Sequence, residues 1–290
     1  MSKHKLISGA LIVTAVSLTA CGSEDTGEGG TITIGHSTYS DGTAFAYVWK
    51  QLLEEEGYTV EMTTFEKAFL FEGTVNGDID LAFGTWLPFT DQAYVSLDTN
   101  ELELTEDHLL YDGAHSGLVV PTYMNDINSI EDLPDAMDEF NGEINGIDPG
   151  SSLMQIMNND IIPHYQLESY ELTISSEQAM MQQLDTAYQN QEPVVVTLWS
   201  PHYAFEDYDL KYLDDPDQVF GEPDSIYYMG RNGFAEDFPN ADSWLKNAYF
   251  EEDQLAELLS LRQDLEDEEQ AAAEWIENNR NLTDNWINQS

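Results

Sequence analysis

One short phrase occurs twice in this chain and constrains its fold more than any other feature. An apolar run ends in a tryptophan that is followed two residues later by proline, first at residues 79–88 (IDLAFGTWLP) and again at residues 194–201 (VVVTLWSP). Since proline cannot donate to a sheet ladder, each run is predicted to be a strand that ends just after its tryptophan. Open α/β sheets bind ligands at strand ends, so Trp86 and Trp199 are both predicted to lie at a binding edge.

The segments before each phrase follow one order, which predicts two similar lobes. Each cycle reads as a strand, a loop with Gly or Ser, a helix, a second strand and a second helix; the first cycle precedes Trp86 from residue 31 and the second precedes Trp199 from residue 144. In the first cycle, residues 40–43 are expected to cap a helix over residues 44–56. Such alternation indicates an α/β fold with a mostly parallel sheet covered on both faces.

The chain is expected to pass between the lobes at least twice. Residues 116–121 (SGLVVP) are predicted to cross into the second lobe and residues 225–229 (SIYYM) to return. Lobe 1 would then comprise residues 31–115 and 224–290, and lobe 2 residues 116–223. The last forty residues are expected to be mainly helical, with Trp244, Trp275 and Trp286 as packing anchors. We therefore expect a ligand cleft between two lobes.

The first thirty residues are not expected to belong to this fold. Lys3 and Lys5 precede an apolar run that is too short for a mature spanning helix and ends at Cys21, the sole cysteine. This pattern is typical of a lipoprotein signal peptide, residues 1–21, whose Cys21 becomes the lipid-bearing N-terminus; an ordinary signal peptide is the alternative. Residues 22–30 are predicted to be a flexible tether. We expect the mature protein at the extracellular face of the cell membrane, held there by its lipid anchor.

The acidic excess excludes nucleic acid as a partner. The chain has 56 Asp and Glu against 9 Lys and Arg, a net charge of -47, whereas nucleic-acid binding needs basic side chains that displace counterions. A hydrophobic content of 41% supplies the core that highly charged disordered chains lack. We interpret the acid as a solvated surface suited to a saline or alkaline exterior.

Several ordered motifs carry a family resemblance. They are residues 85–88 (TWLP), 117–124 (GLVVPTYM), 128–133 (NSIEDL), 146–150 (GIDPG), 199–202 (WSPH), 209–216 (DLKYLDDP) and 272–279 (AAEWIENN). Together they resemble the extracellular binding lipoproteins of glycine betaine ABC transporters of the OpuA type, over nearly all of the predicted mature chain. The resemblance implies a type II periplasmic-binding-protein-like fold, and an ABC permease and ATPase as partners.

The resemblance also implies a cage for a quaternary ammonium group. Such a cation has no N–H to donate, so proteins surround it with aromatic faces. The family role falls on Trp86 and Trp199, and Tyr39 stands near the first loop, where relatives often carry tryptophan. The alternative is that both tryptophans are ordinary core residues.

A betaine carboxylate would need donors, and the loop before the second-cycle helix offers them. The free amides and dipole of a helix start favour an anion. The resemblance assigns this work to Gly150, Ser151 and Ser152, and a simple capped helix start is the alternative.

One position departs from the family pattern. Relatives tend to carry a histidine five residues after the first tryptophan, where it reaches the ligand carboxylate, but this chain has Asp91. Two carboxylates repel, so three hypotheses remain: Asp91 points away, His202 substitutes as the donor, or the ligand has no carboxylate. In the last case Asp91 would favour the positive charge of choline. His202 itself is predicted to be either a ligand contact or a structural donor.

The rival class, a secreted enzyme, lacks its usual sequence signals. There is no Gly-x-Ser-x-Gly elbow, no His-Glu-x-x-His helix, no phosphate loop and no metal-ligand spacing among the histidines. We therefore predict no catalytic residues, no metal and no cofactor. The preferred function is capture of glycine betaine or a related quaternary ammonium compatible solute by a monomeric component of an ABC importer, for osmoprotection. The alternatives are a choline-preferring receptor of the same fold and a membrane-tethered ligand sensor.

Overall fold

The computed structural model describes residues 29–95 and 102–288 of this chain. The predicted signal peptide, Cys21 and the tether up to residue 28 lie outside the described residues. No helix in the two described ranges is long and apolar enough to cross a membrane.

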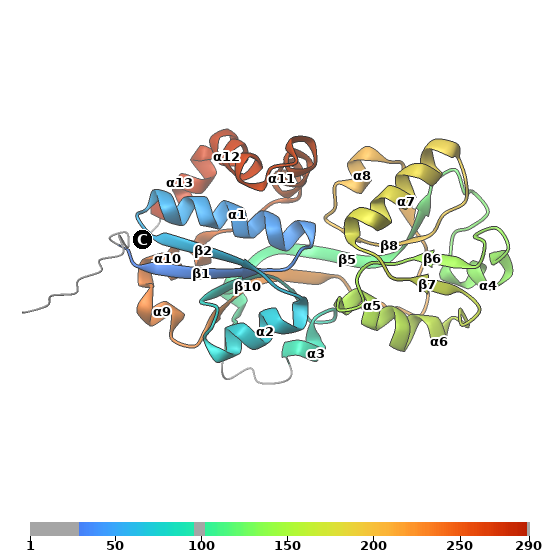
Figure 1. Ribbon diagram of the computed structural model, residues 1–290, viewed down its shortest axis with the longest axis horizontal. Helices are drawn as coiled ribbons and strands as arrows, with labels where there is room; N and C mark the ends of the chain where they lie inside the picture. The colour runs from blue at the N-terminus through green and yellow to red at the C-terminus, as the bar shows by residue number, and fades with distance from the viewer. Residues whose placement is uncertain (1–28, 96–101, 289–290) are drawn as a thin grey trace, which may run out of the picture.

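Two α/β lobes lie side by side along the long axis of the molecule (Figure 1). The first cycle and the segment after it form β1 (Thr31–His36), α1 (Ser40–Glu55), β2 (Thr59–Thr64), α2 (Lys67–Asn76), β3 (Leu81–Leu87), α3 (Gln92–Val95), β4 (Leu102–Glu103) and a 3-10 turn (Glu106–His108). The strand β5 (Leu109–Pro121) leads into the second lobe.

Lobe 2 contains the second cycle. Its elements are a 3-10 turn (Ile130–Asp132), α4 (Leu133–Ala136), β6 (Glu143–Asn145), α5 (Ser152–Ile156), a π-helical turn (Met157–Ile161), α6 (Ile162–His164), β7 (Glu171–Thr173), α7 (Glu177–Asn190), β8 (Val196–Ser200), α8 (Ala204–Asp207) and β9 (Leu210–Tyr212). The chain then returns through β10 (Asp224–Arg231) and ends in α9 (Phe234–Asp237), α10 (Pro239–Asn247), α11 (Glu252–Leu265), α12 (Glu268–Asn278) and α13 (Arg280–Asn288).

The sheet is mixed, which corrects the expectation of a mostly parallel one. In lobe 1 the strand order is β2-β1-β3-β10-β5, and in lobe 2 it is β5-β8-β6-β7. Strands within a cycle pair in parallel, β1 with β2 and β3, and β6 with β7 and β8. The crossing strands β5 and β10 run antiparallel to their neighbours, because the chain reverses each time it changes lobe.

One continuous strand belongs to both lobes. Residues from Leu109 to Ala114 of β5 pair with β10, and residues from His115 to Val119 pair with β8. The outward crossing therefore lies one residue before the segment predicted for it, and β10 supplies the return.

Both tryptophan strands end as the repeated phrase predicts. β3 ends at Leu87 and β8 at Ser200, each directly before its proline. Trp86 pairs with Ile226 of β10, and Trp199 pairs with Ser116 of β5. Each tryptophan thus neighbours a strand that joins the lobes.

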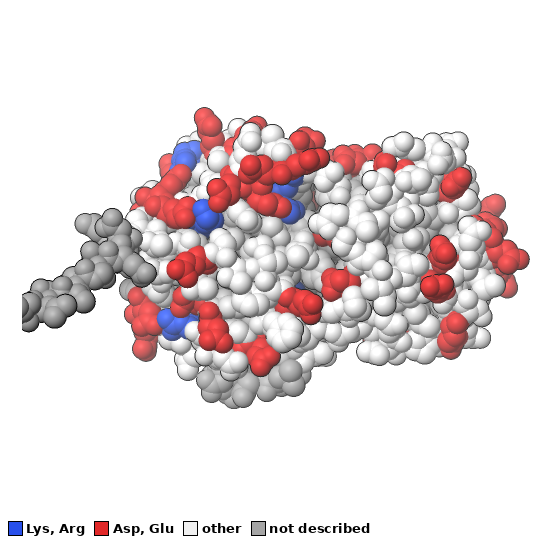
Figure 2. All heavy atoms as spheres, in the orientation of Figure 1, with Lys and Arg blue, Asp and Glu red and all other residues white. Residues whose placement is uncertain are grey.

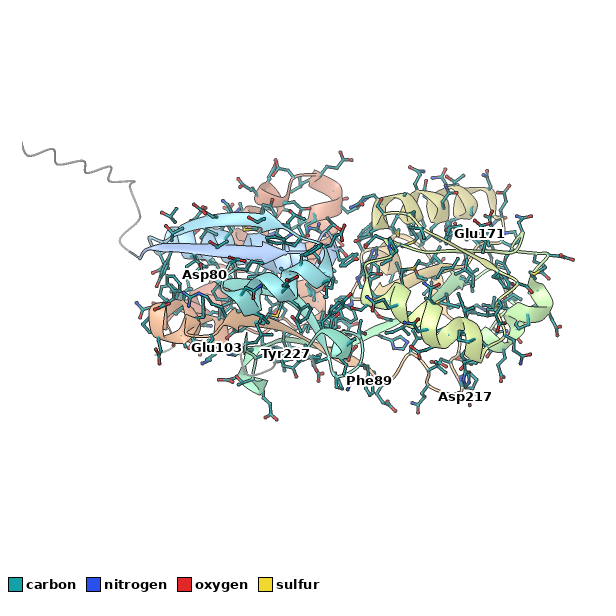
Figure 3. All side chains as sticks on the ribbon, turned by 60° about the horizontal axis from the view of Figure 1, so that its bottom comes forward. Asp80, Phe89, Glu103, Glu171, Asp217 and Tyr227 are labelled. Carbon is teal, nitrogen blue, oxygen red and sulfur yellow. The ribbon has the colours of Figure 1, made fainter. Side chains whose placement is uncertain are left out.

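The return crossing is tied to the loop that follows Trp86. Asp224 accepts hydrogen bonds from the backbone N–H of Phe89 at 2.6 Å and of Thr90 at 3.0 Å. Gly221 has a φ of +90°, and a Cβ there would lie 2.7 Å from the Phe89 ring, so glycine lets the chain pass this ring. Figure 3 shows Phe89 near the junction of the lobes, with Asp80 and Glu103 in lobe 1 and Glu171 and Asp217 in lobe 2.

Helix α1 begins four residues earlier than the sequence predicts. Tyr39 takes the N-cap position in extended conformation without a side-chain cap, and residues 40–43 form the first helical turn. The backbone N–H of Ser40 donates to Glu177 Oε2 of lobe 2 at 3.1 Å. A carboxylate from the other lobe therefore satisfies an N–H that a local cap would otherwise bind.

The C-terminal helices cover lobe 1 through stacked aromatic rings. Trp275 and Trp286 are buried, and Trp286 stacks on Trp49 of α1 with ring centroids 6.1 Å apart. Trp244 packs edge-on against Tyr58. The prediction that these three tryptophans are packing anchors is confirmed.

The charges are unevenly distributed over the lobes. On the face shown in Figure 2, acidic side chains are dense on lobe 1 and lie mainly toward the outer edge of lobe 2, and the basic ones gather on lobe 1. Lys211 is the only Lys or Arg between residues 116 and 223. Each Lys and Arg in the described ranges contacts a carboxylate or an amide oxygen: Lys50, Lys67, Lys211, Arg231, Lys246, Arg262 and Arg280.

Candidate functional site

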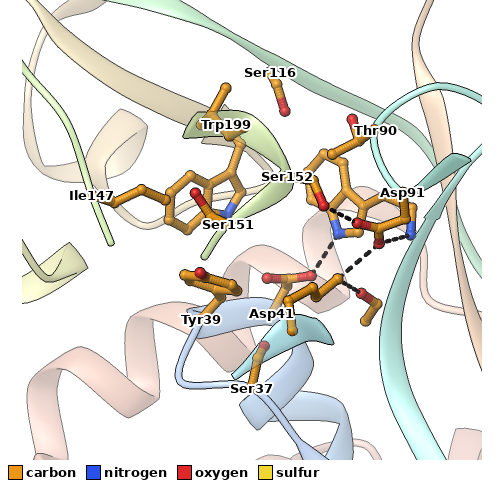
Figure 4. A pocket seen from close by; sticks show the side chains of 14 residues that line it. Ser37, Tyr39, Asp41, Thr90, Asp91, Ser116, Ile147, Ser151, Ser152 and Trp199 are labelled. Atoms are coloured by element: carbon orange, nitrogen blue, oxygen red, sulfur yellow. Dashed lines mark hydrogen bonds and ion pairs between the residues drawn. The ribbon is translucent and has the colours of Figure 1, made fainter. Parts of the chain in front are cut away.

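A cavity lies where the ends of β3 and β8 meet between the lobes (Figure 4). The empty space inside it, which includes solvent at its open mouth, is about 430 Å³. Its walls are formed by Ser37, Tyr39, Asp41, Lys67, Gly84, Trp86, Thr90, Asp91, Ser116, Ile147, Ser151, Ser152, Leu153 and Trp199.

The three predicted aromatic residues meet in this cavity. Tyr39, at the start of α1, and Trp86 come from lobe 1, and Trp199 comes from lobe 2. The rings of Tyr39 and Trp199 meet edge-on with centroids 6.0 Å apart. Aromatic faces from both lobes therefore border one small space, as a cation cage requires.

Asp41 is a wall residue that the sequence reasoning assigned only to a helix cap. Its Oδ2 accepts a hydrogen bond from Trp86 Nε1 at 2.8 Å and fixes the orientation of that indole. Burial raises the pKa of the Asp41 carboxyl, while the Trp86 N–H and the charge of Lys67 act in the opposite direction and the charge of Glu177 adds to the rise. When ionised, Asp41 is an anion beside the aromatic faces.

Asp91 does not point away from the cavity, and its carboxylate is fully engaged. Asp91 Oδ2 accepts from the backbone N–H of Trp86 at 2.8 Å and forms an ion pair with Lys67 Nζ at 2.8 Å. Its other oxygen accepts from Ser152 Oγ across the cleft. The side chains of Asp91 and Lys67 are 0% and 6% exposed, so this is a buried pair whose charges cancel.

Lys67 is a second residue of the cavity wall that was not predicted from the sequence. It begins α2, and its ammonium also donates to the carbonyl oxygen of Gly84. A signal was present, because Lys67 is the only Lys or Arg between residues 51 and 210 of a strongly acidic chain. What the sequence does not reveal is that its partner is Asp91.

The loop predicted to bind an anion already uses its side-chain donors. Ser151 Oγ donates to the carbonyl of Asp148 at 3.0 Å and accepts from Met154 N at 3.1 Å, so Ser151 caps α5. Ser152 donates to Asp91. The N–H of Gly150 donates to Asp148 Oδ1 at 3.0 Å, and Gly150 is not among the cavity walls.

His202 contacts the cage from outside the cavity. Its ring meets the Trp199 ring edge-on at 4.9 Å. Nδ1 accepts from Ala204 N at 3.0 Å and Nε2 lies 3.1 Å from Glu177 Oε1, so the proton of a neutral ring belongs on Nε2. His202 is thus placed to hold Trp199, and it does not line the cavity.

Hydrogen bonds across the cleft hold the two lobes in a closed arrangement. Tyr39 OH donates to the Asp148 carboxylate. Tyr94 OH donates to the carbonyl of Gly150 at 3.2 Å and accepts from the side chain of Gln155. Together with the Ser152–Asp91 and Ser40–Glu177 hydrogen bonds, they join the two lobes across the cleft. Within residues 29–95 and 102–288, no cluster of His, Cys, Asp and Glu could hold a metal ion.

Comparisons with known proteins agree with this geometry. Residues 30–278 match the family described as the substrate binding domain of ABC-type glycine betaine transport system. The glycine betaine/carnitine transport binding protein GbuC of Listeria monocytogenes is 36% identical over 153 residues, 52% of this chain and 51% of that protein. This chain therefore aligns with about half the length of that curated relative.

Two solved structures with a ligand are similar over most of the chain. Lactococcal OpuAC, closed on glycine betaine, has a TM-score of 0.83 and 30% identity over 89% of this chain and 99% of that chain. An ABC-transporter choline binding protein in complex with choline has a TM-score of 0.81 and 27% identity over 89% of this chain and 91% of that chain.

Proposed function

Because this chain belongs to the family of substrate-binding domains of ABC-type glycine betaine transport systems, we propose that it captures a quaternary ammonium compatible solute and delivers it to an ABC permease and ATPase. The family is one of solute-binding proteins and not of enzymes. Glycine betaine and choline, the ligands of the two solved relatives, define the chemical class.

The observation that carries the proposal is the meeting of Tyr39, Trp86 and Trp199 in one cavity between two lobes. Each aromatic contact with an ammonium group contributes about 0.5–2 kcal/mol, and desolvation raises the value. The cage is complete only when the lobes are closed, because Trp199 belongs to lobe 2 and the other two rings to lobe 1. A ligand that contacts both lobes therefore favours closure.

Choline is the second candidate, and Asp41 favours it. Its carboxylate lines the cavity without a basic partner of its own, since Lys67 pairs with Asp91. A cation compensates this charge. His202 would serve by positioning Trp199 instead of touching the ligand.

The location and assembly of the protein also belong to the proposal. We expect Cys21 to carry the lipid that holds the mature chain at the extracellular face of the membrane, and a monomer to work with the permease. Mass spectrometry of the membrane fraction tests the first expectation, because a diacylglyceryl adduct should be lost in Cys21→Ser.

The test of the ligand class is isothermal titration of the chain without its first 21 residues, residues 22–290, with glycine betaine and choline. 3,3-Dimethylbutan-1-ol, which has the shape of choline without its charge, is the matched control. Binding of either ammonium compound, with the neutral isostere at least tenfold weaker, supports the cage. If neither ammonium compound binds, or the alcohol binds equally well, the proposed function is wrong.

A further inference from the structure

We infer that this pocket selects quaternary ammonium cations without a carboxylate, because Asp91 already binds Lys67 and Ser152, two side-chain donors of the wall. The inference rests on the proposed function and specifies its substrate class: choline-like cations in preference to betaines.

Several side-chain donors in the cavity wall already have acceptors in the protein. The loop at the start of α5 was predicted to receive a ligand carboxylate, yet Ser152 Oγ already donates to Asp91. Ser151 Oγ donates to the carbonyl of Asp148. The ammonium of Lys67 lies between Asp91 Oδ2 and the Gly84 carbonyl. A ligand carboxylate would have to take these donors from acceptors of the protein.

The charge of the cavity wall disfavours a ligand carboxylate. Three ionisable side chains with a formal charge line the cavity, Asp41, Asp91 and Lys67. Lys67 neutralises Asp91, which leaves Asp41. A cation would pair with Asp41, whereas the carboxylate of a betaine would add a buried negative charge for which the described wall holds no further basic side chain. Selection would thus come from repulsion of the wrong ligand.

One buried side-chain donor in the cavity wall has no acceptor in the described part of the chain. The indole Nε1 of Trp199 is buried and has no hydrogen-bond partner within the described ranges. A hydroxyl oxygen can accept from this neutral donor, so an alcohol such as choline is satisfied without a charged group. This donor alone does not balance a carboxylate, whose charge needs several donors or a cation.

The wild-type protein decides the inference with three ligands in parallel titrations: choline, glycine betaine and the amide of glycine betaine, carbamoylmethyl-trimethylammonium. The amide has the shape of the betaine but no negative charge. We expect choline and the amide to bind at least tenfold more tightly than the betaine. Betaine binding as tight as or tighter than the amide overturns the inference and leaves the proposed function intact. If none of the three binds, the proposed function fails and the inference fails with it.

The variant Asp91→Asn tests whether Asp91 is the cause. It removes the negative charge and frees Lys67 and Ser152 for the ligand, so the affinity of betaine relative to choline should rise at least tenfold. Asp224→Asn is the matched control: Asp224 is also buried and binds backbone N–H groups of the same loop, but it does not line the cavity. An unchanged ratio in Asp91→Asn, or an equal rise in Asp224→Asn, overturns the role of Asp91. The wild-type series remains decisive if either variant does not fold.

Discussion

Two conservative substitutions, Trp86→Phe and Trp199→Phe, should differ sharply in their effect on stability. Both keep an aromatic face toward the cavity, and both remove one indole N–H from a buried side chain. Trp86 Nε1 donates to Asp41 at 2.8 Å, whereas Trp199 Nε1 has no partner in the described part of the chain. Only the first substitution therefore leaves a buried carboxylate oxygen without its donor.

The size of the difference follows from this one bond. The two tryptophans are 6% and 4% exposed, so the loss of apolar contact is similar in both variants and largely cancels. A hydrogen bond to a charged group contributes about 1.5–3 kcal/mol. We expect Trp86→Phe to lower the free energy of unfolding by about that much more than Trp199→Phe does.

Urea unfolding of the ligand-free mature protein, followed by circular dichroism, measures both variants. In an Asp41→Asn background the difference should shrink, since the Trp86 N–H then donates to a neutral amide oxygen. Equal destabilisation by the two substitutions, or a difference that persists unchanged with Asn at position 41, would show that the indole bond to Asp41 does not hold this wall.

Three further predictions concern the ligand. Trp86→Ala and Trp199→Ala should each weaken quaternary ammonium binding tenfold or more, at least about 1.4 kcal/mol by titration; unchanged affinity in both would remove the cage. Burial raises the pKa of Asp41, so the affinity for a cation should be full above that pKa and fall as the pH decreases through it. Asp41→Asn should flatten this dependence of affinity on pH. If the variant shows the same pH dependence as the wild type, Asp41 is not its source. Tyr94→Phe removes a cross-lobe hydrogen bond to Gly150. A neutral hydrogen bond contributes about 0.5–1.5 kcal/mol, so ligand dissociation measured by stopped-flow fluorescence should become about 2- to 12-fold faster. An unchanged rate would mean that Tyr94 does not stabilise closure.

Much of the fold follows from local sequence patterns. The two cycles and the ends of β3 and β8 are predictable because proline and apolar periodicity act within a few residues of the chain. The start of α1 is not, because the Ser40 N–H is satisfied by Glu177, which lies 137 residues away. The antiparallel pairing of β5 and β10 likewise depends on how the lobes are joined.

The site residues, too, are only partly predictable from the sequence. Trp86 and Trp199 stand in motifs that can be read directly, Tyr39 stands near the first loop, and the structure places all three in the cavity wall. The roles of Asp41 and Lys67 depend on partners at positions 86 and 91, and no spacing rule connects these pairs. In so acidic a chain, a single functional carboxylate also carries no signal of its own.

The buried ion pair between Lys67 and Asp91 constrains which substitutions this protein can accept during evolution. A substitution of either residue alone leaves the other charge buried and unpaired, at a cost of about 3–5 kcal/mol, a large part of the roughly 5–15 kcal/mol that keeps a protein folded. The two residues should therefore be substituted together in a lineage, or one after the other in an order that depends on the solutes in the medium. A medium rich in betaine would supply a carboxylate to an unpaired Lys67, so that the available solute itself would decide which single mutation a population could survive.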